Sequence, residues 1–373
     1  MAKLGEVCTI VSGSTPKTSV TSYWDGNIKW ITPAELNEDT FYIMDSVRHI
    51  TEEGKEKTGL SYLPTGTVIL SSRAPIGKTA IAGCKMCCNQ GFKNLICSDA
   101  IYNEYLYFFL KSKTDYLNSL GRGATFKEIS KSIVENIEIP LPEVNQQKEI
   151  AEKFKKLEQL ISLRKQQLAK LDELVKARFV ELFGDVSQKD ALKNLCNFID
   201  YRGKTPDKVD IGLPFITAKN VRMHYMSFDT QEFISKESYD KVMTRGIPRV
   251  GDVLFTTEAP LGNVCRIPQL NTEFYIGQRI ITMQTDVLAP AYLEYALSSD
   301  DFKKELNKKS SGSTVTGIRS KLLEEMSIPV PPLSLQNDFA AFVGRVDQQK
   351  QTVQQSLEKL ELMKKALMQE YFG

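Results

Sequence analysis

The sequence predicts an α+β protein built as a tandem internal repeat, with two pseudo-symmetric domains that are separated by two long antiparallel coiled-coil helices. Three observations predict this class. The chain repeats itself along its whole length. Each copy begins with a region in which short β-branched runs alternate with helical segments and with turns rich in Gly, Pro, Ser and Thr. Each copy then ends in a long segment with a seven-residue hydrophobic period.

The repeat is visible when the two halves of the chain are aligned. The run GTVILSSRAPIGKTAIAG (66–83) matches GDVLFTTEAPLGNVCRIP (251–268) at an offset of 185 residues. The run ENIEIPLPEVNQQKEI (135–150) matches EEMSIPVPPLSLQNDF (324–339) at an offset of 189 residues. The drift in offset indicates short insertions in loops. Solenoids use shorter and more numerous repeats, so the pattern indicates a duplication.

The mixed part of each copy is predicted to fold as a domain. GTVILSS and GDVLFTT are β-branched runs opened by glycine, and we expect them to be strands. The segments 103–120 and 290–309 have the composition of helices. Together with the Gly, Pro, Ser and Thr turns between them, these elements predict domains over residues 1–141 and 185–330.

A proline hinge and a long helix follow each domain. Ile-Pro-Leu-Pro and Ile-Pro-Val-Pro-Pro predict extended chain, because proline and the residue before it disfavour helix. Neither 147–183 nor 336–372 contains a proline. The predicted spacer helices cover 142–184 and 331–373. A helix of this length extends roughly 55 Å, which is longer than a small domain is wide.

The long helices carry a heptad seam whose positions are separated alternately by four and three residues. Two such seams in one chain can bury each other, and duplicated units commonly pair about a twofold axis, which makes the helices antiparallel. The apolar seam residues are Ile150, Phe154, Leu157, Ile161, Leu168, Leu171, Val175, Leu182, Phe339, Val343, Val346, Val353, Leu357, Leu360 and Leu367. The remaining positions hold Tyr371 and four charged residues, Arg164, Arg178, Lys350 and Lys364, which either set the register or extend to solvent.

Composition limits the class of protein. The chain has 373 residues, 42% of them hydrophobic and 25% charged, with a formal net charge of +2. No segment is strongly basic, so binding to nucleic acid would require a local basic surface. No apolar run approaches the roughly 20 residues of a membrane span. The N-terminus lacks a signal-peptide core and the seven cysteines are odd in number, which predicts a cytoplasmic protein with reduced thiols and no membrane partner.

The motifs of common active sites are incomplete. APIGKT (74–79) ends like a phosphate-binding loop, but Ser72 stands where the first glycine is needed. Cys84, Cys87, Cys88 and Cys97 could bind zinc or be small buried hydrophobes, and we favour the second reading because the other copy lacks the cluster. The chain has two histidines, and they are not at matching positions. We therefore predict no catalytic site, no metal site and no cofactor in this chain.

What repeats instead is a set of polar loops. Arg and Lys reach phosphates and guanine edges, Gln and Asn pair with adenine, and glycine lets a backbone approach DNA closely. The alternative is that these loops are ordinary solvated turns. The candidate DNA-binding residues are Lys17, Arg73, Lys78, Gln90, Lys93, Arg122, Lys127, Arg202, Lys204, Lys219, Thr257, Gln278, Arg279 and Ser313.

The order of these fragments resembles the specificity subunits of type I restriction–modification systems. The resemblance is carried by SGSTPKT…YWDGNIKWITPAELN, SRAPIGK, the GRGAT and SGST loops, and the two helix openings IPLPEVNQQKEIAEKF and IPVPPLSLQNDFAAFV, and it covers essentially the whole chain. One departure is Leu335 before Gln336, where the family often has Glu. We expect this difference to alter a helix N-terminus and to leave the function intact.

The resemblance implies a non-catalytic subunit of a complex. The two globular parts would be target-recognition domains that each read one half of a split double-stranded DNA site. The helices would set the spacer and dock two methyltransferase subunits, which carry S-adenosylmethionine and methylate adenine. Restriction subunits, where the system has them, would carry ATP- and magnesium-dependent translocation and cleavage. The competing interpretations are a coiled-coil adaptor that binds proteins without recognising DNA, and an enzyme with a hidden nuclease or NTPase site.

Overall fold

The computed structural model describes residues 1–37, 40–73, 75–123, 127–203, 206–312 and 316–373. The chain divides into two compact units. Unit 1 comprises residues 1–165 and 355–373, and unit 2 comprises residues 166–354. Both units mix helices and sheets, which confirms the α+β class. Across the described ranges, no helix is long and apolar enough to cross a membrane.

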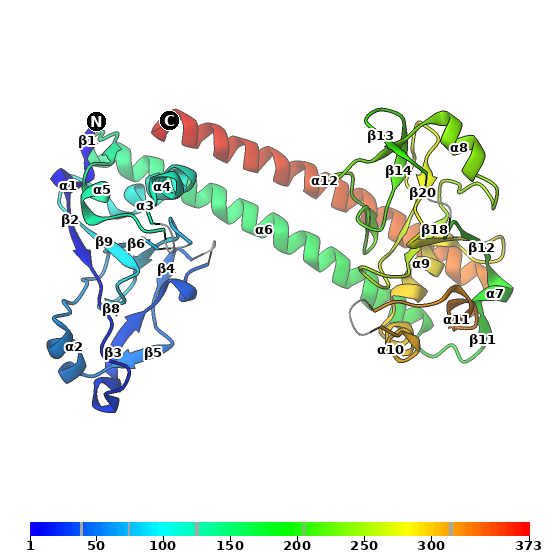
Figure 1. The fold of residues 1–373 in the computed structure, drawn as a ribbon, viewed down its shortest axis with the longest axis horizontal. Coiled ribbons are helices and arrows are strands. Elements are labelled where there is room, and N and C mark those ends of the chain that lie inside the picture. The colour runs from blue at the N-terminus through cyan, green and yellow to red at the C-terminus, as the bar shows by residue number, and fades with distance from the viewer. Residues whose placement is uncertain (38–39, 74, 124–126, 204–205, 313–315) are drawn as a thin grey trace. The chain divides into compact units, whose positions relative to one another are not determined.

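Unit 1 is built on a five-stranded mixed sheet (Figure 1). Its order is β2 (Cys8–Ser12), β9 (Phe92–Cys97), β6 (Val68–Ser71), β7 (Thr79–Ala82) and β4 (Tyr42–Ile43). The first four strands pair antiparallel, and β4 pairs parallel with β7. A second sheet has the order β5 (Arg48–Ile50), β3 (Trp24–Ile31) and β8 (Cys87–Cys88), with α2 (Glu52–Thr58) in the same region. Strands β6 and β7 of the five-stranded sheet are buried along their length, as their apolar sequences require.

The helices of unit 1 cover the large sheet. They are α1 (Leu4–Val7), α3 (Asn103–Ser112), α4 (Thr114–Leu120) and α5 (Lys131–Glu135), and the pair β1 (Ala2–Lys3) and β10 (Glu138–Ile139) closes the domain. Residues Tyr105 through Leu110 of α3 are all buried, because one face packs on the sheet and the other meets the long helices. The core therefore joins the sheet, α3, Phe154 and Phe372 in one cluster.

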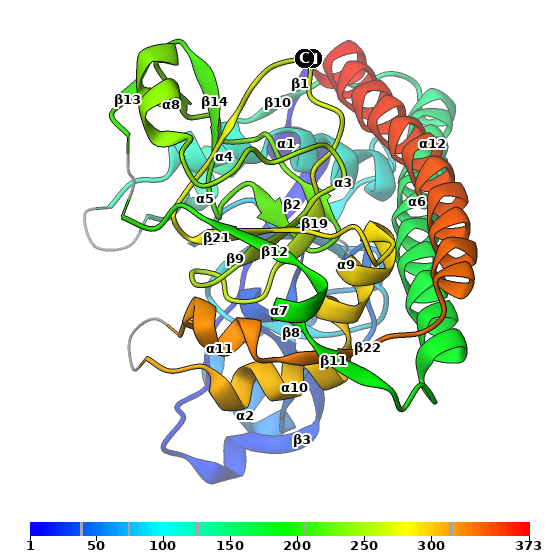
Figure 2. The ribbon, with the colours of Figure 1, turned by 90° about the vertical axis from the view of Figure 1, so that its right-hand side faces the viewer.

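Unit 2 repeats this topology (Figure 2). Its main sheet runs β12 (Asn197–Asp200), β21 (Ile280–Gln284), β18 (Val253–Thr256) and β19 (Val264–Arg266), all antiparallel. The second sheet runs β13 (Lys208–Val209), β17 (Phe233–Ile234), β14 (Leu213–Ile216) and β20 (Tyr275–Ile276). As in β3 and β8, its strands β14 and β20 pair parallel.

Smaller elements complete the second unit. The helices are α7 (Leu192–Leu195), α8 (Lys236–Val242), α9 (Pro290–Ser298), α10 (Asp300–Lys309) and α11 (Ser320–Glu324). The short strand pairs are β11 (Lys189–Ala191) with β22 (Ser327–Pro329), and β15 (Val221–Arg222) with β16 (Tyr225–Met226). The pair β11 and β22 corresponds to β1 and β10, so in both predicted domains a short strand at the start pairs with a short strand at the end.

The long helices are α6 (Val144–Phe183) and α12 (Leu333–Phe372), and each unit contains a part of both. In unit 1, Phe154 stacks on Phe372 at 5.6 Å, and Lys364 Nζ lies 2.6 Å from Glu158 Oε1. In unit 2, the ring of Phe179 meets Phe339 edge to face at 5.6 Å. In unit 1, Phe154 contacts Phe372 and Glu158 contacts Lys364. In unit 2, Asp172 contacts Lys350 and Phe179 contacts Phe339. Residues later in α6 thus contact residues earlier in α12, so the paired segments are antiparallel.

The predicted seam corresponds to the covered side of these helices. Ten of its residues are buried, namely Ile150, Phe154, Leu157, Ile161, Val175, Phe339, Val343, Val346, Val353 and Leu357. The other five are half-buried, namely Leu168, Leu171, Leu182, Leu360 and Leu367. At the end of α6 the buried residues are Phe179 and Phe183, one position later than the heptad predicts. A straight helix drifts against a seven-residue repeat, and here the end of α6 packs on Tyr292 of α9 in unit 2.

The charged seam positions have different roles. Lys350 pairs with Asp172 and Lys364 with Glu158, so both lysines join one long helix to the other. This favours the register interpretation for the two lysines. Arg178 pairs instead with Glu181 on its own helix at 2.8 Å.

A buried glutamine locks each hinge to the domain before it. Gln147 is fully buried. Its Oε1 accepts from the Tyr102 N–H at 2.8 Å, and its Nε2 donates to the carbonyls of Ala100 and Pro142 at 3.0 and 2.8 Å. Gln336 repeats the arrangement, accepting from Ala289 N–H at 3.0 Å and donating to Pro331 O at 2.8 Å.

This lock explains why the hinge sequence occurs twice. Tyr102 and Ala289 are the N-caps of α3 and α9, whose backbone N–H groups need partners. The hinge carbonyls have no strand or helix partner of their own at that point. In each copy, one glutamine side chain bonds to the N–H of the N-cap and to a carbonyl of the hinge, since an amide carries an acceptor and a donor.

We expect Gln147→Leu to lower the free energy of unfolding of unit 1 by about 2–4 kcal/mol, because it leaves a buried N–H and two buried carbonyls without a partner. The two tryptophans of the chain, Trp24 and Trp30, both lie in unit 1, so tryptophan fluorescence during urea unfolding reports this unit. Gln159→Leu, at an exposed position of the same helix, is the control. Equal midpoints for the two variants would contradict the lock.

Candidate nucleic-acid interface

A hydrogen-bonded turn joins β6 to β7 in unit 1 and β18 to β19 in unit 2. The buried Ser71 hydroxyl donates to Pro75 O and accepts from Lys78 N–H, both at 2.8 Å. In the second copy, Thr256 Oγ1 accepts from Asn263 N–H at 2.9 Å. The turn also needs glycine at Gly77 and its counterpart Gly262, where φ is +94° and +83°. The turn therefore has the same framework in both copies.

Two further loops meet this turn at Ser72. The N–H of Ser72 donates to Gly91 O at 2.7 Å, and its carbonyl accepts from Ile129 N–H at 2.9 Å. The second copy builds the same junction at Thr257, with Arg279 O at 2.9 Å and Ile318 N–H at 3.0 Å. We call these two junctions the loop nodes. Each node joins three segments that are far apart in the sequence.

The segments that leave each node are also fixed. Arg122 and Glu128 exchange two backbone hydrogen bonds, at 3.1 and 3.0 Å, at the base of the loop that contains GRGAT. Ser311 and Gly317 make the same exchange, at 3.0 and 3.0 Å, in the second copy. The Thr15 hydroxyl donates to Gln90 Oε1, which brings the loop after β2 to the first node.

The charges at the first node are organised by one carboxylate. Arg73 Nε lies 2.9 Å from Glu128 Oε2, and Lys93 Nζ lies 3.1 Å from Glu128 Oε1. Burial acts to raise the pKa of the Glu128 carboxyl, but hydrogen bonds from Arg73 and then Lys93 outweigh it, and the pKa lies below its usual value. Arg122 and Lys127 are exposed beside this pair.

The second node reverses the charges. Glu258 stands at the position of Arg73, and Gly317 stands at the position of Glu128. The cation is now Arg279, whose Nε lies 2.9 Å from Glu258 Oε1. Arg279 occupies the place of Gly91, because the two carbonyls accept equivalent hydrogen bonds. An ion pair is thus kept while its two charges move to different loop segments.

Several predicted residues have internal roles. Lys78 Nζ donates to Leu36 O at 2.6 Å, and the matching Asn263 Nδ2 donates to Val221 O at 2.9 Å. Both side chains therefore hold the same neighbouring loop. Lys93 is buried on Glu128, and Thr257 is buried in the second node. The sequence indicates Lys78, Lys93 and Thr257 as candidate DNA-binding residues, whereas in the structure their side chains bond within the protein.

The remaining predicted residues lie at the surface or outside the described ranges. Lys17, Arg73, Gln90, Arg122, Lys127, Lys219, Gln278 and Arg279 are exposed. Arg202 is half-buried and forks onto Asp200, with Nε 2.9 Å from Oδ2. Lys204 and Ser313 fall on residues that the structure does not describe. Contact of any of these residues with DNA stays a prediction.

Sequence reasoning missed Glu128 and Arg245. Glu128 organises the first node, and Arg245 donates to the carbonyls of Asp200 and Arg202 at 2.6 and 2.9 Å. An acidic residue is not an obvious member of a DNA-binding loop. Its matching position is glycine in the other copy, so the repeat gave no signal for it.

The cysteine cluster does not converge. Cys84 Sγ lies 3.2 Å from Met44 O, whereas Cys87 and Cys88 belong to different hydrophobic cores. Among the residues that the structure describes, no group of three or more His, Cys, Asp and Glu side chains could hold a metal ion.

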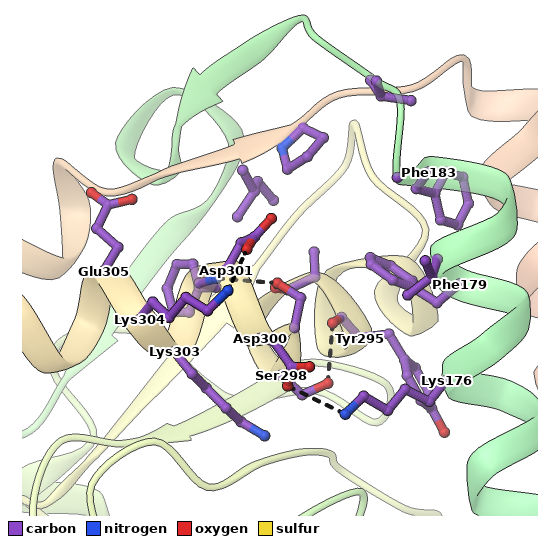
Figure 3. Close-up of a pocket in the computed structure, with 18 of the residues that line it drawn as sticks. Lys176, Phe179, Phe183, Tyr295, Ser298, Asp300, Asp301, Lys303, Lys304 and Glu305 are labelled. Carbon is purple, nitrogen blue, oxygen red and sulfur yellow. Dashed lines mark hydrogen bonds and ion pairs between the residues drawn. The ribbon is translucent and has the colours of Figure 1, made fainter.

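Unit 2 also contains a cavity of about 590 Å³ between the end of α6, α9 and α10 (Figure 3). Phe179, Phe183 and Tyr295 form its apolar wall. Lys176 Nζ and Asp300 Oδ1 pair at 3.2 Å across its rim. His224 also lines it, stacking on Tyr295 and lying 3.0 Å from Glu294 through Nδ1. The cavity shares no lining residue with the second node.

Comparisons with known proteins agree on one family. The family described as Type I restriction modification DNA specificity domain matches residues 1–173 and 187–362. The type I restriction enzyme MjaIX specificity subunit of Methanocaldococcus jannaschii is 34% identical over 257 residues, which cover 68% of this chain and 50% of that protein. The MjaVIII specificity subunit of the same organism is 25% identical over 301 residues, covering 74% and 70%.

The fold has a solved counterpart. The crystal structure of a type I restriction–modification S subunit from M. genitalium matches with a TM-score of 0.60 at 16% identity, covering 100% of this chain and 95% of that one. This chain spans half the length of the MjaIX subunit that it matches.

We expect Glu128→Gln to lower the free energy of unfolding of unit 1 by about 1–3 kcal/mol, because the buried Lys93 ammonium loses its carboxylate partner. The matched change Glu258→Gln should cost less than about 1 kcal/mol, since Glu258 and Arg279 pair at the exposed surface. Urea unfolding measures both, by tryptophan fluorescence for unit 1 and by circular dichroism for the whole chain. A larger loss for Glu258→Gln would contradict this assignment.

The first of these variants should also change the acid limb of stability. The folded-state pKa of Glu128 is lowered, so its ion pairs contribute fully above the unfolded pKa of about 4.3 and are lost as the pH falls through the folded value. Glu128→Gln should therefore remove part of the stability loss that wild-type unit 1 shows between about pH 5 and pH 3. Parallel curves for wild type and variant would show that another carboxylate causes the loss.

Proposed function

Since this chain belongs to the family of type I restriction–modification DNA specificity domains, we propose that it is the sequence-recognition subunit of such a system, and that it binds a bipartite double-stranded DNA target through its two loop nodes. The observation that carries the proposal is the node itself. The same three segments meet in both units, while the exposed charges around them differ. Two domains that recognise two different half-sites need the same backbone framework with different exposed side chains.

The exposed residues at each node have the chemistry for this role. Arg122 and Lys127 at the first node, with Lys17 on a nearby loop of unit 1 and Lys219 in unit 2, can contact phosphates and so position the protein. Gln90 and Gln278 are exposed at the two nodes, and a glutamine amide can read adenine through two hydrogen bonds. The net charge of +2 leaves a small electrostatic contribution to affinity, so partner subunits would add contacts.

The long helices would be the spacer between the half-sites. We infer an antiparallel coiled coil, supported by the buried seam and by the contacts of Lys350 and Lys364 within the two units. Two readers on a rigid element of this kind would reach grooves about one helical turn, roughly 34 Å, apart.

The partners follow from the same proposal. Two methyltransferase subunits would dock on the duplicated helices and methylate adenine with S-adenosylmethionine. Restriction subunits would add ATP- and magnesium-dependent cleavage, all in the cytoplasm. This chain would contribute recognition and no catalysis.

Two experiments test the proposal against its rivals. Methylome sequencing of the host should give a split motif, and replacing residues 1–141 by the matching part of a relative should change only one half of it. A change in both halves, or in neither, would contradict a modular reader. Gel shifts with duplex DNA, with and without the methyltransferase subunit, separate the reader from a protein-binding adaptor. Turnover by the isolated chain with magnesium, ATP and DNA would indicate a hidden enzyme.

We expect Arg122→Ala and Gln90→Ala to have different effects on the assembled complex. Arg122→Ala should remove a phosphate contact, weaken binding to all sequences alike and lower the salt slope of log Kd by about 1. Gln90→Ala should remove a base contact and lower the discrimination against wrong bases at one position of the site by about 1–3 kcal/mol. Fluorescence anisotropy with a cognate duplex and single-base variants, at several salt concentrations, measures both.

The control for both changes is Lys57→Ala, at an exposed position of α2 outside the node segments and outside the long helices. It removes one positive charge as Arg122→Ala does. If it lowered DNA affinity and the salt slope as much as Arg122→Ala, the effect would come from net charge, and the role of the node would be refuted.

We also expect helix length to set the gap between half-sites. Inserting seven residues after Leu168 and seven after the matching Leu357 keeps both seams in phase. The added rise is about 10 Å, which corresponds to roughly three base pairs. Methylome sequencing should then return the same half-sites with a longer gap.

A four-residue insertion is the matched control. Four residues shift the seam out of phase, so the helices should lose their pairing and the complex its activity. An unchanged gap in a folded, active complex with the seven-residue insertions would show that DNA bending or partner subunits set the spacing.

A further inference from the structure

Two cysteines face each other across the edge of the main sheet in unit 1. Cys8 begins β2 and Cys97 ends β9, and the antiparallel register pairs them directly. The N–H of Ser98 donates to Val7 O at 3.0 Å, so the cysteines occupy a non-hydrogen-bonded position of the ladder. Opposite Cα atoms at such a position lie about 4.5 Å apart. This separation falls within the range that a disulfide spans.

The two sulfur atoms are neighbours. A hydrogen bond with Cys97, followed by burial, raises the pKa of the Cys8 thiol above its usual range. Cys8 is 7% exposed and belongs to the core of unit 1, whereas Cys97 is half-buried. One thiol is therefore accessible and the other is held against it from the inside.

A cavity gives access to Cys97. It has a volume of about 380 Å³ and is lined by Cys97, Ser98, Asp99 and the loop at Pro64 to Thr67. Its open, polar lining admits a small charged reagent from solvent. The other thiols of the chain lack this combination, since Cys87, Cys88, Cys196 and Cys265 are buried and Cys84 lies against Met44 O.

We propose that Cys8 and Cys97 form a cross-strand disulfide when the protein meets a low-molecular-weight disulfide oxidant, such as oxidised glutathione. The Cys97 thiolate attacks one sulfur of the oxidant, which gives a mixed disulfide and one released thiol. Cys8 then attacks Cys97 Sγ and passes its proton to the departing glutathione sulfur, which forms the protein disulfide and releases the second thiol. The protein loses two electrons, and the two thiol protons leave on the released thiols.

The disulfide is a reversible clamp on the edge of unit 1. It closes a loop of about 90 residues, which includes β3 to β8 and the turn of the first node. Its formation needs only the local register of β2 and β9, so the proposal does not rest on DNA recognition. The second copy is an internal control, because the ladder of β12 and β21 ends at Asn197 and Gln284, and the residues next to this pair are Cys196 and Thr285, which cannot form a disulfide.

The test treats the reduced, full-length chain with oxidised glutathione and maps its peptides by mass spectrometry. We expect a linked peptide that contains Cys8 and Cys97. The melting temperature of unit 1, followed by tryptophan fluorescence, should rise by about 5–10 °C, and dithiothreitol should reverse both effects. No linked peptide in a chain that remains folded would overturn the proposal, as would a link between other cysteines.

Three variants make the assignment specific. Cys8→Ser should stop at a glutathione adduct on Cys97, because the resolving thiol is missing. Cys97→Ser should show neither adduct nor link at Cys8, which solvent does not reach. Cys196→Ser should behave like the wild type. If Cys8→Ser left Cys97 unmodified while the wild type became oxidised, attack through Cys97 would be refuted.

Discussion

The buried amides of Gln147 and Gln336 are the contacts on which the rest of the structure depends. Each lies in the first turn of a long helix, directly after a proline hinge whose prolines lack backbone N–H groups for hydrogen bonds. Each satisfies the N-cap of a buried helix and the carbonyls of the hinge together. The direction in which each long helix leaves its domain is therefore fixed by buried hydrogen bonds, whose loss is costly.

The loop nodes are likewise held by hydrogen bonds that occur in both copies, here at the surface of each unit. At Ser72 and Thr257, backbone hydrogen bonds hold three loops together, so the side chains that they carry can change without loss of the frame. Arg73 and Glu258 illustrate this freedom, since opposite charges stand at one position and each pairs with a residue from a different loop. A frame that tolerates such exchange is suited to domains that read different half-sites.

The candidate site was only partly predictable because the same residue types serve two purposes. Exposed Arg122 and Gln90 lie where the polar loops indicated. Lys78 and Lys93 have the same chemistry, but both point inward, to Leu36 O and to Glu128. A lysine in a glycine-rich turn gives no local sign of which way it points. That direction depends on a carbonyl or carboxylate far away in the sequence.

The sequence by itself determined the duplication, the mixed class, the two hinges and the two long helices, because these follow from local periodicity and from the stereochemistry of proline. Only the tertiary structure decided which charges are paired, where the heptad phase gives way to Phe179 and Phe183, and that Cys8 faces Cys97. These features depend on contacts between residues many positions apart. Strand register and packing fix such contacts, and neither is encoded in any short segment of the chain.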